Sequence, residues 1–424
     1  MGFGSLVIFT WTMKAKLSNF IALDLGSSKI STIAAIIDKK GESRILSQGI
    51  HLSKGVKSGL VLDLKTAENT IINAIYALEK DYGKNIKQVA ISLSGAKTKS
   101  YYLNNKIKLS NQPISKNDVT KLIQKILSEF KVKNQEIIHY FPVEFIIDGN
   151  NFVENPIGMI GSELTCQLHI VAAESTVITN LINCFAKCQL EVSSIILAIY
   201  ASGLACLLED EKNLGSIIID IGSATTSFGV FLSGKLIYSG YVDIGSWHVT
   251  SDIAKVFSIN LLLAEKLKVL YGNAFPSPFD KDNMINIDDA DMDYYNNTTL
   301  AITSNNLAMV IHPRIEEILL MIKAKYDALN VDHLISRRLV ITGGGSMLRG
   351  VKELASKVFE KQVRIGKPHI IPGFAEDYNP GMYSTSVGMI KNQALKLQQN
   401  SFDVHQDNDK SWLHKAAKWL KENI

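Results

Sequence analysis

The chain has 424 residues, a formal net charge of +4, 20% charged residues and 46% hydrophobic residues. This length is far beyond the ~100 to 200 residues of one ordinary domain, so we expect at least two hydrophobic cores. The weak net charge gives little drive toward polyanions, and we expect no nucleic-acid partner. Four scattered cysteines exclude a disulfide scaffold and indicate a reducing, cytoplasmic compartment.

Residues 1–19 are predicted to be an N-terminal extension. Their apolar stretch has no Lys or Arg before it and no small-residue cleavage site after it, so it is a poor signal peptide. Translation could begin at Met1 or at Met13, which stands just before the first strand signal. No window reaches the ~20 apolar residues that a membrane-spanning helix needs.

Residues 20–28, FIALDLGSS, and residues 217–226, IIIDIGSATT, repeat one pattern: an apolar run, an aspartate, a glycine and small hydroxyls. The β-branched run predicts a buried strand, and the glycine permits a tight turn, so the second strand should stop at Gly222. Further strand patterns follow each copy. The two segments are therefore predicted to be duplicated β-hairpins.

An aspartate at such a strand end must face a cation or water, because an unpaired buried carboxylate costs several kcal/mol. Two facing Asp–Gly turns could clamp one phosphate chain, while Asp24 and Asp220 hold Mg²⁺ through its waters. The alternative for either copy alone is a satisfied structural turn, but the duplication favours a site. The candidate phosphate-binding residues are Asp24, Gly26, Ser27, Ser28, Lys29, Asp220, Gly222, Ser223, Thr225, Thr226 and Gly245.

Residues 339–359, LVITGGGSMLRGVKELASKVF, predict a strand, a glycine-rich turn and a helix. Three consecutive glycines, Gly343, Gly344 and Gly345, would allow a flat ligand to approach the backbone closely. Ser346 is expected to cap the helix that follows.

Residues 261–272, LLLAEKLKVLYG, predict another helix near the same ligand. Glu265 and Lys268 share one face of it and could reach a ribose or purine edge. The alternative is a solvent-exposed pair of opposite charges three residues apart.

The C-terminus ends in SWLHKAAKWLKENI, residues 411–424, after a polar linker at 396–410. As a helix it spans about 20 Å, too short for a ~30 Å apolar bilayer core, so we expect it to lie flat on an anionic membrane surface. The alternative is docking onto the protein's own body. The predicted membrane-binding residues are Trp412, Leu413, Lys415, Lys418, Trp419, Leu420, Lys421 and Ile424.

Two Asp–Gly hairpins followed by a strand–Gly–Gly–helix, in this order, resemble the actin-like ATPase superfamily. Within it the chain is most similar to the bacterial cell-division FtsA family, from Phe20 to the C-terminus. The segments that carry this similarity are SLSGAKTKSYYLN, FPVEFIIDG, NPIGMIGSELTCQLHIVAA, GSWHVTSDIAKVF, KQVRIGKP and YSTSVGMI.

The resemblance implies an α/β, actin-like two-domain (duplicated ribonuclease H-like) ATPase fold with an inserted α+β subdomain in the first half. Its expected parts are a first actin-like domain (20–86, 174–213 and 378–395), the insertion (87–173), a second actin-like domain (214–250 and 338–377) and an outer subdomain (251–337).

The family implies a protein that binds ATP and Mg²⁺ and polymerises on the cytoplasmic face of the cell membrane at the division site. It would bind the C-terminal peptide of FtsZ through the outer subdomain and contact neighbouring copies and later division proteins through the insertion. A role in partner contact is open for the acidic loop 280–299.

Hydrolysis is expected to be weak or absent, because Ala198 stands where the related chaperone ATPases carry a water-positioning glutamate. Two alternative functions are an actin-like small-molecule kinase and an FtsA-like pilus-assembly adaptor.

Overall fold

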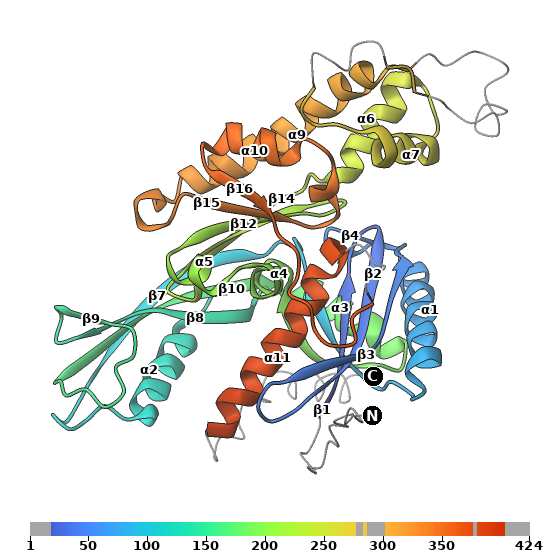
Figure 1. Cartoon of the computed structure of the whole chain (residues 1–424). Coiled ribbons are helices and arrows are strands. Elements are labelled where there is room, and N and C mark those ends of the chain that lie inside the picture. Colours follow the sequence, from blue (N-terminus) through green and yellow to red (C-terminus); the bar gives the residue numbers. More distant parts are fainter. Residues whose placement is uncertain (1–17, 277–282, 286–301, 376–379, 403–424) are drawn as a thin grey trace, which may run out of the picture.

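The computed structural model consists of two large α/β bodies and a smaller inserted module (Figure 1). None of the helices it describes has both the length and the apolar surface to span a bilayer. The structure describes residues 18–276, 283–285, 302–375 and 380–402.

The first body is built on a five-stranded sheet with the order β11-β6-β1-β2-β3. Strands β1, β2 and β3 run antiparallel in sequence, and β6 and β11 continue the sheet in parallel on the other side of β1. The predicted first hairpin is therefore confirmed. The strands are β1 (Ser18–Leu25), β2 (Lys29–Ile37), β3 (Ser43–Leu52), β6 (Gln88–Leu93) and β11 (Glu191–Leu197).

Helices cover both faces of this first sheet. Helices α1 (Leu64–Tyr82) and α3 (Ser175–Lys187) contribute apolar side chains to one core, and α4 (Ala198–Cys206) and α11 (Ser384–Phe402) contribute to another. A small hairpin, β4 (Val56–Lys57) and β5 (Leu60–Val61), precedes α1.

The second body repeats the arrangement, because its sheet has the order β14-β13-β12-β15-β16 with the same antiparallel and parallel pairings. The duplication predicted from the two Asp–Gly segments is thus confirmed for all five strands of each sheet. The strands are β12 (Ser216–Ile221), β13 (Thr226–Leu232), β14 (Lys235–Val242), β15 (Arg338–Thr342) and β16 (Gln362–Ile365).

The outer part of the second body consists of helices that extend one continuous core away from the sheet. The predicted boundary at residue 251 falls inside a helix, because α6 begins at Ser246, shortly after β14 ends. The helices are α6 (Ser246–Phe257), α7 (Leu261–Tyr271), α9 (Ser304–Asp327) and α10 (Val351–Phe359), and the short α5 (Glu209–Asn213) joins the two bodies.

The inserted module is a four-stranded sheet with the order β7-β10-β8-β9 and one helix packed on it. Its helix begins in a reciprocal capping box between Ser115 and Asp118. The predicted boundary at residue 87 places β6 in the insertion, whereas the structure pairs β6 with β1 in the first sheet. The elements are β7 (Lys99–Lys108), α2 (Lys116–Glu129), β8 (Gln135–Ile147), β9 (Asn151–Val153) and β10 (Glu163–Glu174).

Both chain ends differ from the predicted boundaries where the structure describes them. Strand β1 begins at Ser18, inside the predicted extension, and α11 continues to Phe402, inside the predicted linker. The helix-forming residues Leu395, Lys396 and Leu397 explain this continuation. The predicted membrane-binding segment and most of the acidic loop lie outside the described residues.

Candidate functional site

The two Asp–Gly turns have nearly the same backbone geometry. The Gly26 N–H donates to the Lys29 carbonyl at 3.0 Å, and the Gly222 N–H donates to the Thr225 carbonyl at 2.9 Å. A Cβ atom on either glycine would lie 2.8 or 2.9 Å from the carbonyl that it faces. Both turns therefore require glycine because of this close approach.

The turns face each other across one cavity between the two bodies. This cavity brings together eleven of the predicted site residues: Asp24, Gly26, Ser27, Ser28, Lys29, Asp220, Gly222, Ser223, Thr225, Gly343 and Gly344. Its other lining residues are Leu25, Gly59, Ser94, Ala198, Ile199, Ser227, Gly381, Met382 and Thr385.

Each aspartate is held by a serine from outside its own hairpin. Ser92 Oγ, at the end of β6, donates to Asp24 Oδ1 at 2.6 Å, and Ser202 Oγ, on α4, donates to Asp220 Oδ2 at 2.7 Å. Sequence reasoning did not assign these two serines. Ser92 could have been found, because it lies in the SLSG segment that carries the family resemblance.

The charged groups of the cavity have displaced pKa values. Burial, together with the charge of Asp220, raises the pKa of Asp24 to about 6, although the hydrogen bond from Ser92 and the charge of Lys29 act to lower this pKa. Burial also raises the pKa of Asp220, and it lowers the pKa of Lys29 although both aspartates act in the opposite direction. Two carboxylates and one ammonium share a poorly hydrated space, which favours a bound cation.

The donor set fits a magnesium ion held through water. Among the described residues, no three His, Cys, Asp or Glu side chains gather into a direct metal cluster. Asp24 and Asp220 each use one oxygen to accept from a serine, so their other oxygens remain for water ligands. Mg²⁺ commonly binds one or two carboxylates, keeps several waters and takes phosphate oxygens as its remaining ligands.

The glycine-rich segment closes the cavity beside Asp220. Gly343 has a φ of +86°, and a Cβ atom there would lie 2.2 Å from Asp220 Oδ1, so the backbone can pass only as glycine. The prediction that Ser346 caps a helix is wrong. Its hydroxyl donates back to the Gly343 carbonyl at 2.7 Å in a 3-10 turn, and α10 begins later, after Gly350.

Three predicted residues sit behind the cavity wall. The Thr226 hydroxyl donates to the Ile244 carbonyl at 2.8 Å, which takes it away from the cavity. Gly245 packs against the Ser223 carbonyl, which would lie 2.5 Å from an added Cβ atom, and Gly345 packs against Ile221. These residues shape the turns and do not line the cavity.

Glu265 and Lys268 form an ion pair at 2.7 Å on α7, outside the residues that line the cavity. The ammonium of Lys268 is buried and also donates to Thr250 Oγ1 at 2.9 Å and to the Ser246 carbonyl at 3.3 Å. The pair therefore ties α7 to the start of α6 and is more than a solvated surface pair. Its contact with an adenosine stays a prediction.

Ala198 and Ile199, at the start of α4, line the cavity opposite the glycine-rich segment. The acidic side chains in the lining of the described cavity are Asp24 and Asp220. Beyond these two aspartates, the lining of the described cavity has no carboxylate that could orient an attacking water beside Ala198.

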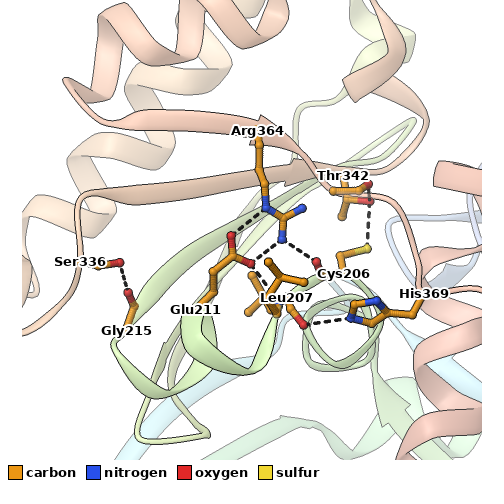
Figure 2. Close-up of polar contacts among 10 residues, drawn as sticks. Cys206, Leu207, Glu211, Gly215, Ser336, Thr342, Arg364 and His369 are labelled. Atoms are coloured by element: carbon orange, nitrogen blue, oxygen red, sulfur yellow. Dashed lines mark hydrogen bonds and ion pairs between the residues drawn. The ribbon is translucent and has the colours of Figure 1, made fainter.

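A polar network behind the cavity joins the α4–α5 segment to β15 and β16 (Figure 2). Arg364 Nε donates to Glu211 Oε1 at 2.7 Å, and its Nη2 donates to the Cys206 carbonyl at 2.7 Å. Burial would raise the pKa of Glu211, but the hydrogen bond and charge of Arg364 lower it below its usual range. Thr342 links the same region to Ser384 at 2.7 Å.

Family models match two parts of the chain. Residues 217–388 match the model described as "Cell division protein FtsA", and residues 95–172 match the model described as "SHS2 domain inserted in FTSA". The second match coincides with the inserted module, from the end of β6 to β10.

Curated relatives resemble the chain over nearly its whole length. The cell division protein FtsA of Rhizobium meliloti (strain 1021) is 31% identical over 421 residues, which cover 95% of this chain and 94% of that protein. The cell division protein FtsA of Escherichia coli (strain K12) is 26% identical over 414 residues, which cover 95% and 98%.

Solved structures confirm the actin-like fold. A structure of the PilM-PilN type IV pilus biogenesis complex matches with a TM-score of 0.62 and 14% identity, over 90% of this chain and 99% of that chain. MreB5 of Spiroplasma citri bound to ADP matches with a TM-score of 0.53 and 13% identity, over 91% and 98%.

Proposed function

Because the chain belongs to the FtsA family of cell division proteins, we propose that it binds ATP with Mg²⁺ between its two aspartate turns. The observation that carries this proposal is the meeting of both turns, Lys29 and the glycine-rich segment at one cavity. MreB5 of Spiroplasma citri, which has a similar fold, binds ADP in its crystal structure.

Each wall of the cavity would supply a distinct set of contacts to the phosphates. Backbone N–H groups of the two turns and the hydroxyls of Ser27, Ser28 and Thr225 donate to phosphate oxygens, and Lys29 adds a positive charge. Asp24 and Asp220 hold the waters of a magnesium ion, which neutralises phosphate charge. Gly343 and Gly344 leave room for the nucleoside, with Glu265 and Lys268 at its far end.

The same cavity supports slow or absent hydrolysis. Phosphoryl transfer depends on positioning and electrostatics, and a group that orients the attacking water contributes much of the rate. Ala198 offers no such group. The small-molecule kinase is not favoured for a similar reason, because the described cavity carries no carboxylate beyond the two that face the metal.

Calorimetric titration with ATP and a non-hydrolysable analogue, each with and without Mg²⁺, tests this proposal. We expect binding that weakens strongly when Mg²⁺ is removed, because both carboxylates then face the phosphates without a cation. Absence of any adenine-nucleotide binding would refute the proposal. Phosphate release measured on the same samples tests whether turnover is slow.

We further propose that the C-terminal tail attaches the protein to a membrane. Residues 411–424, which lie outside the described residues, would act as an amphipathic helix on the anionic inner leaflet and anchor the protein to the cytoplasmic face of the cell membrane at the division site. Burial of its five large apolar side chains contributes roughly 8 to 15 kcal/mol, and ordering of the segment offsets most of this. A filament of many copies therefore binds far better than one copy.

Liposome flotation tests the anchor. Full-length protein should float with vesicles that contain anionic lipid, and protein that lacks residues 411–424 should remain in the soluble fraction. A second variant replaces Lys415, Lys418 and Lys421 by glutamine. Its binding to the vesicles should be weaker than that of the full-length protein and independent of salt, because the attraction to anionic lipid is removed. Unchanged flotation after the deletion would refute the anchor.

The outer helices offer a surface for the C-terminal peptide of FtsZ. Exposed apolar side chains gather on α6 and α7, among them Val256, Leu262 and Val269, with exposed fractions of 61%, 85% and 68%. Large exposed apolar groups of this kind favour a protein partner. Through this surface the filament tethers the FtsZ ring, and through the inserted module it contacts neighbouring copies and later division proteins.

Binding of a synthetic FtsZ C-terminal peptide, followed by fluorescence anisotropy, tests this assignment. Leu262→Lys should weaken binding at least tenfold, because it places a charge in an apolar contact. Leu320→Lys, at a 50% exposed position on α9, is the matched control and should bind like the parent protein. Equal binding by both variants would move the site elsewhere.

A further inference from the structure

The small hairpin formed by β4 and β5 is attached to the first aspartate turn. The backbone N–H of Ser58, in the turn of this hairpin, donates to Ser27 Oγ at 2.9 Å. Lys57 precedes Ser58 and is exposed. Any movement of the first turn relative to the second body therefore carries Lys57 with it.

The start of helix α6 is attached to the second aspartate turn in the same way. The Ser246 N–H donates to the Gly222 carbonyl, and the Trp247 N–H donates to the Ser223 carbonyl, both at 2.9 Å. Trp247 is 41% exposed, although other residues of α6 are buried in the core of the second body. Its position is thus tied to the second turn.

Lys57 and Trp247 meet between the two bodies, next to Gly59 and Ser223, which line the cavity. The ammonium of Lys57 lies 5.1 Å from the centre of the indole, within the range of a cation–π contact. In the lining itself, Ser94 Oγ, from the first body, lies 3.3 Å from Thr225 Oγ1, from the second. The two walls are therefore in contact both inside the cavity and next to it.

We propose that Lys57 and Trp247 form a clasp that holds the two aspartate turns together and slows the opening of the cavity. Because each partner is hydrogen-bonded, through itself or its neighbour, to a different turn, separation of the turns must separate the ammonium from the indole. The effect of the clasp on the release of a nucleotide rests on the proposed function.

Thiol labelling in the ligand-free protein measures the opening directly. Thr225 lines the cavity but is largely buried against Ser94, so a thiol introduced by Thr225→Cys should react faster when the walls separate. The background carries Cys188→Ser, because Cys188 is the partly exposed native thiol among four cysteines. Lys57→Ala and Trp247→Leu should each raise the labelling rate about two- to fivefold, the range of an exposed cation–π contact.

The controls separate the clasp from a general loosening. Lys57→Arg keeps a cation over the ring, and Lys54→Ala removes an exposed lysine three residues away, so both should label at the parent rate. Without the thiol, Lys57→Ala should also speed release of a fluorescent ATP analogue about two- to fivefold.

Two outcomes decide the matter. If Lys57→Ala labels at the parent rate, the clasp is refuted, whatever the nucleotide does. If the parent protein binds no nucleotide, the proposed function fails, and the labelling rates still decide whether the clasp exists.

Discussion

The two aspartate turns have the same backbone conformation but differ in the charge of their side chains. Asp24 lies opposite Ser31 in its hairpin and Asp220 lies opposite Ser227, so the register of the two copies is the same. Five residues after each aspartate, however, the first copy carries a lysine and the second a buried threonine, Thr225.

This difference assigns separate tasks to the two walls. The repeated backbone offers the same N–H groups to a phosphate chain from both sides, but only the first turn brings an ammonium, Lys29, to it. The serines that hold the aspartates also come from different elements, Ser92 from β6 and Ser202 from α4. The two turns therefore have the same shape but carry different charge.

Loss of either aspartate should have the largest effect, because both walls contribute a carboxylate to the metal. Asp24→Ala and Asp220→Ala should each weaken Mg²⁺·ATP binding by about 2 kcal/mol or more, which is roughly 30-fold. Calorimetric titration measures this, with Asp210→Ala on the exposed face of α5 as the control. If only one aspartate matters, the two walls do not share the metal.

Substitution of the residue five positions after each aspartate tests the charge asymmetry. Lys29→Met should weaken ATP binding about tenfold or more, because it removes a charged donor, and Thr225→Val about threefold, because it removes a neutral one. Titrations at two salt concentrations separate the cases further, since only the Lys29→Met variant should lose salt dependence. Equal losses in affinity and in salt dependence would contradict the asymmetry.

The last expected effect concerns the stability of the ligand-free protein and not its binding of nucleotide. The raised pKa of Asp24, about 6, means that the folded state holds its proton more tightly than the unfolded state. The free energy of unfolding therefore falls as pH rises from about 4 to about 6, and the loss persists above pH 6. Asp24→Asn should remove this loss and stabilise the ligand-free protein at pH 7.5 by roughly 1 to 3 kcal/mol.

Urea denaturation at pH 4 and pH 7.5 measures the effect, which should vanish at the lower pH. Asp118→Asn serves as a control of opposite sign, because hydrogen bonds from Ser115 lower the pKa of Asp118 in its capping box. That variant should be less stable than the parent at pH 7.5. An Asp24→Asn variant that is also destabilised at pH 7.5 would contradict the buried, uncompensated carboxylate.

Local patterns predicted the parts of the fold that depend on neighbouring residues. Both hairpins and their glycine turns were predictable, because an apolar β-branched run followed by a glycine is visible in consecutive residues. The order of the Asp–Gly segments was sufficient to indicate the duplicated fold.

The remaining features depend on contacts between distant residues. Ser92 and Ser202 reach the aspartates from 68 and 18 residues away, and no local pattern states such a distance. Ser346 illustrates a competing local choice, because its hydroxyl satisfies the preceding turn instead of capping α10. Strand β6 was assigned to the insertion because the residues of β6 do not indicate which strand they pair with, and its pairing with β1 is a contact between distant parts of the chain.

A crystal structure of the protein with Mg²⁺ and a non-hydrolysable ATP analogue tests the central claim most directly. The account predicts the triphosphate between the turn at Gly26 and the turn at Gly222, with Lys29 on one side and the metal's waters on Asp24 and Asp220. A nucleotide bound anywhere else, or a phosphate chain that contacts only one of the two turns, would contradict it.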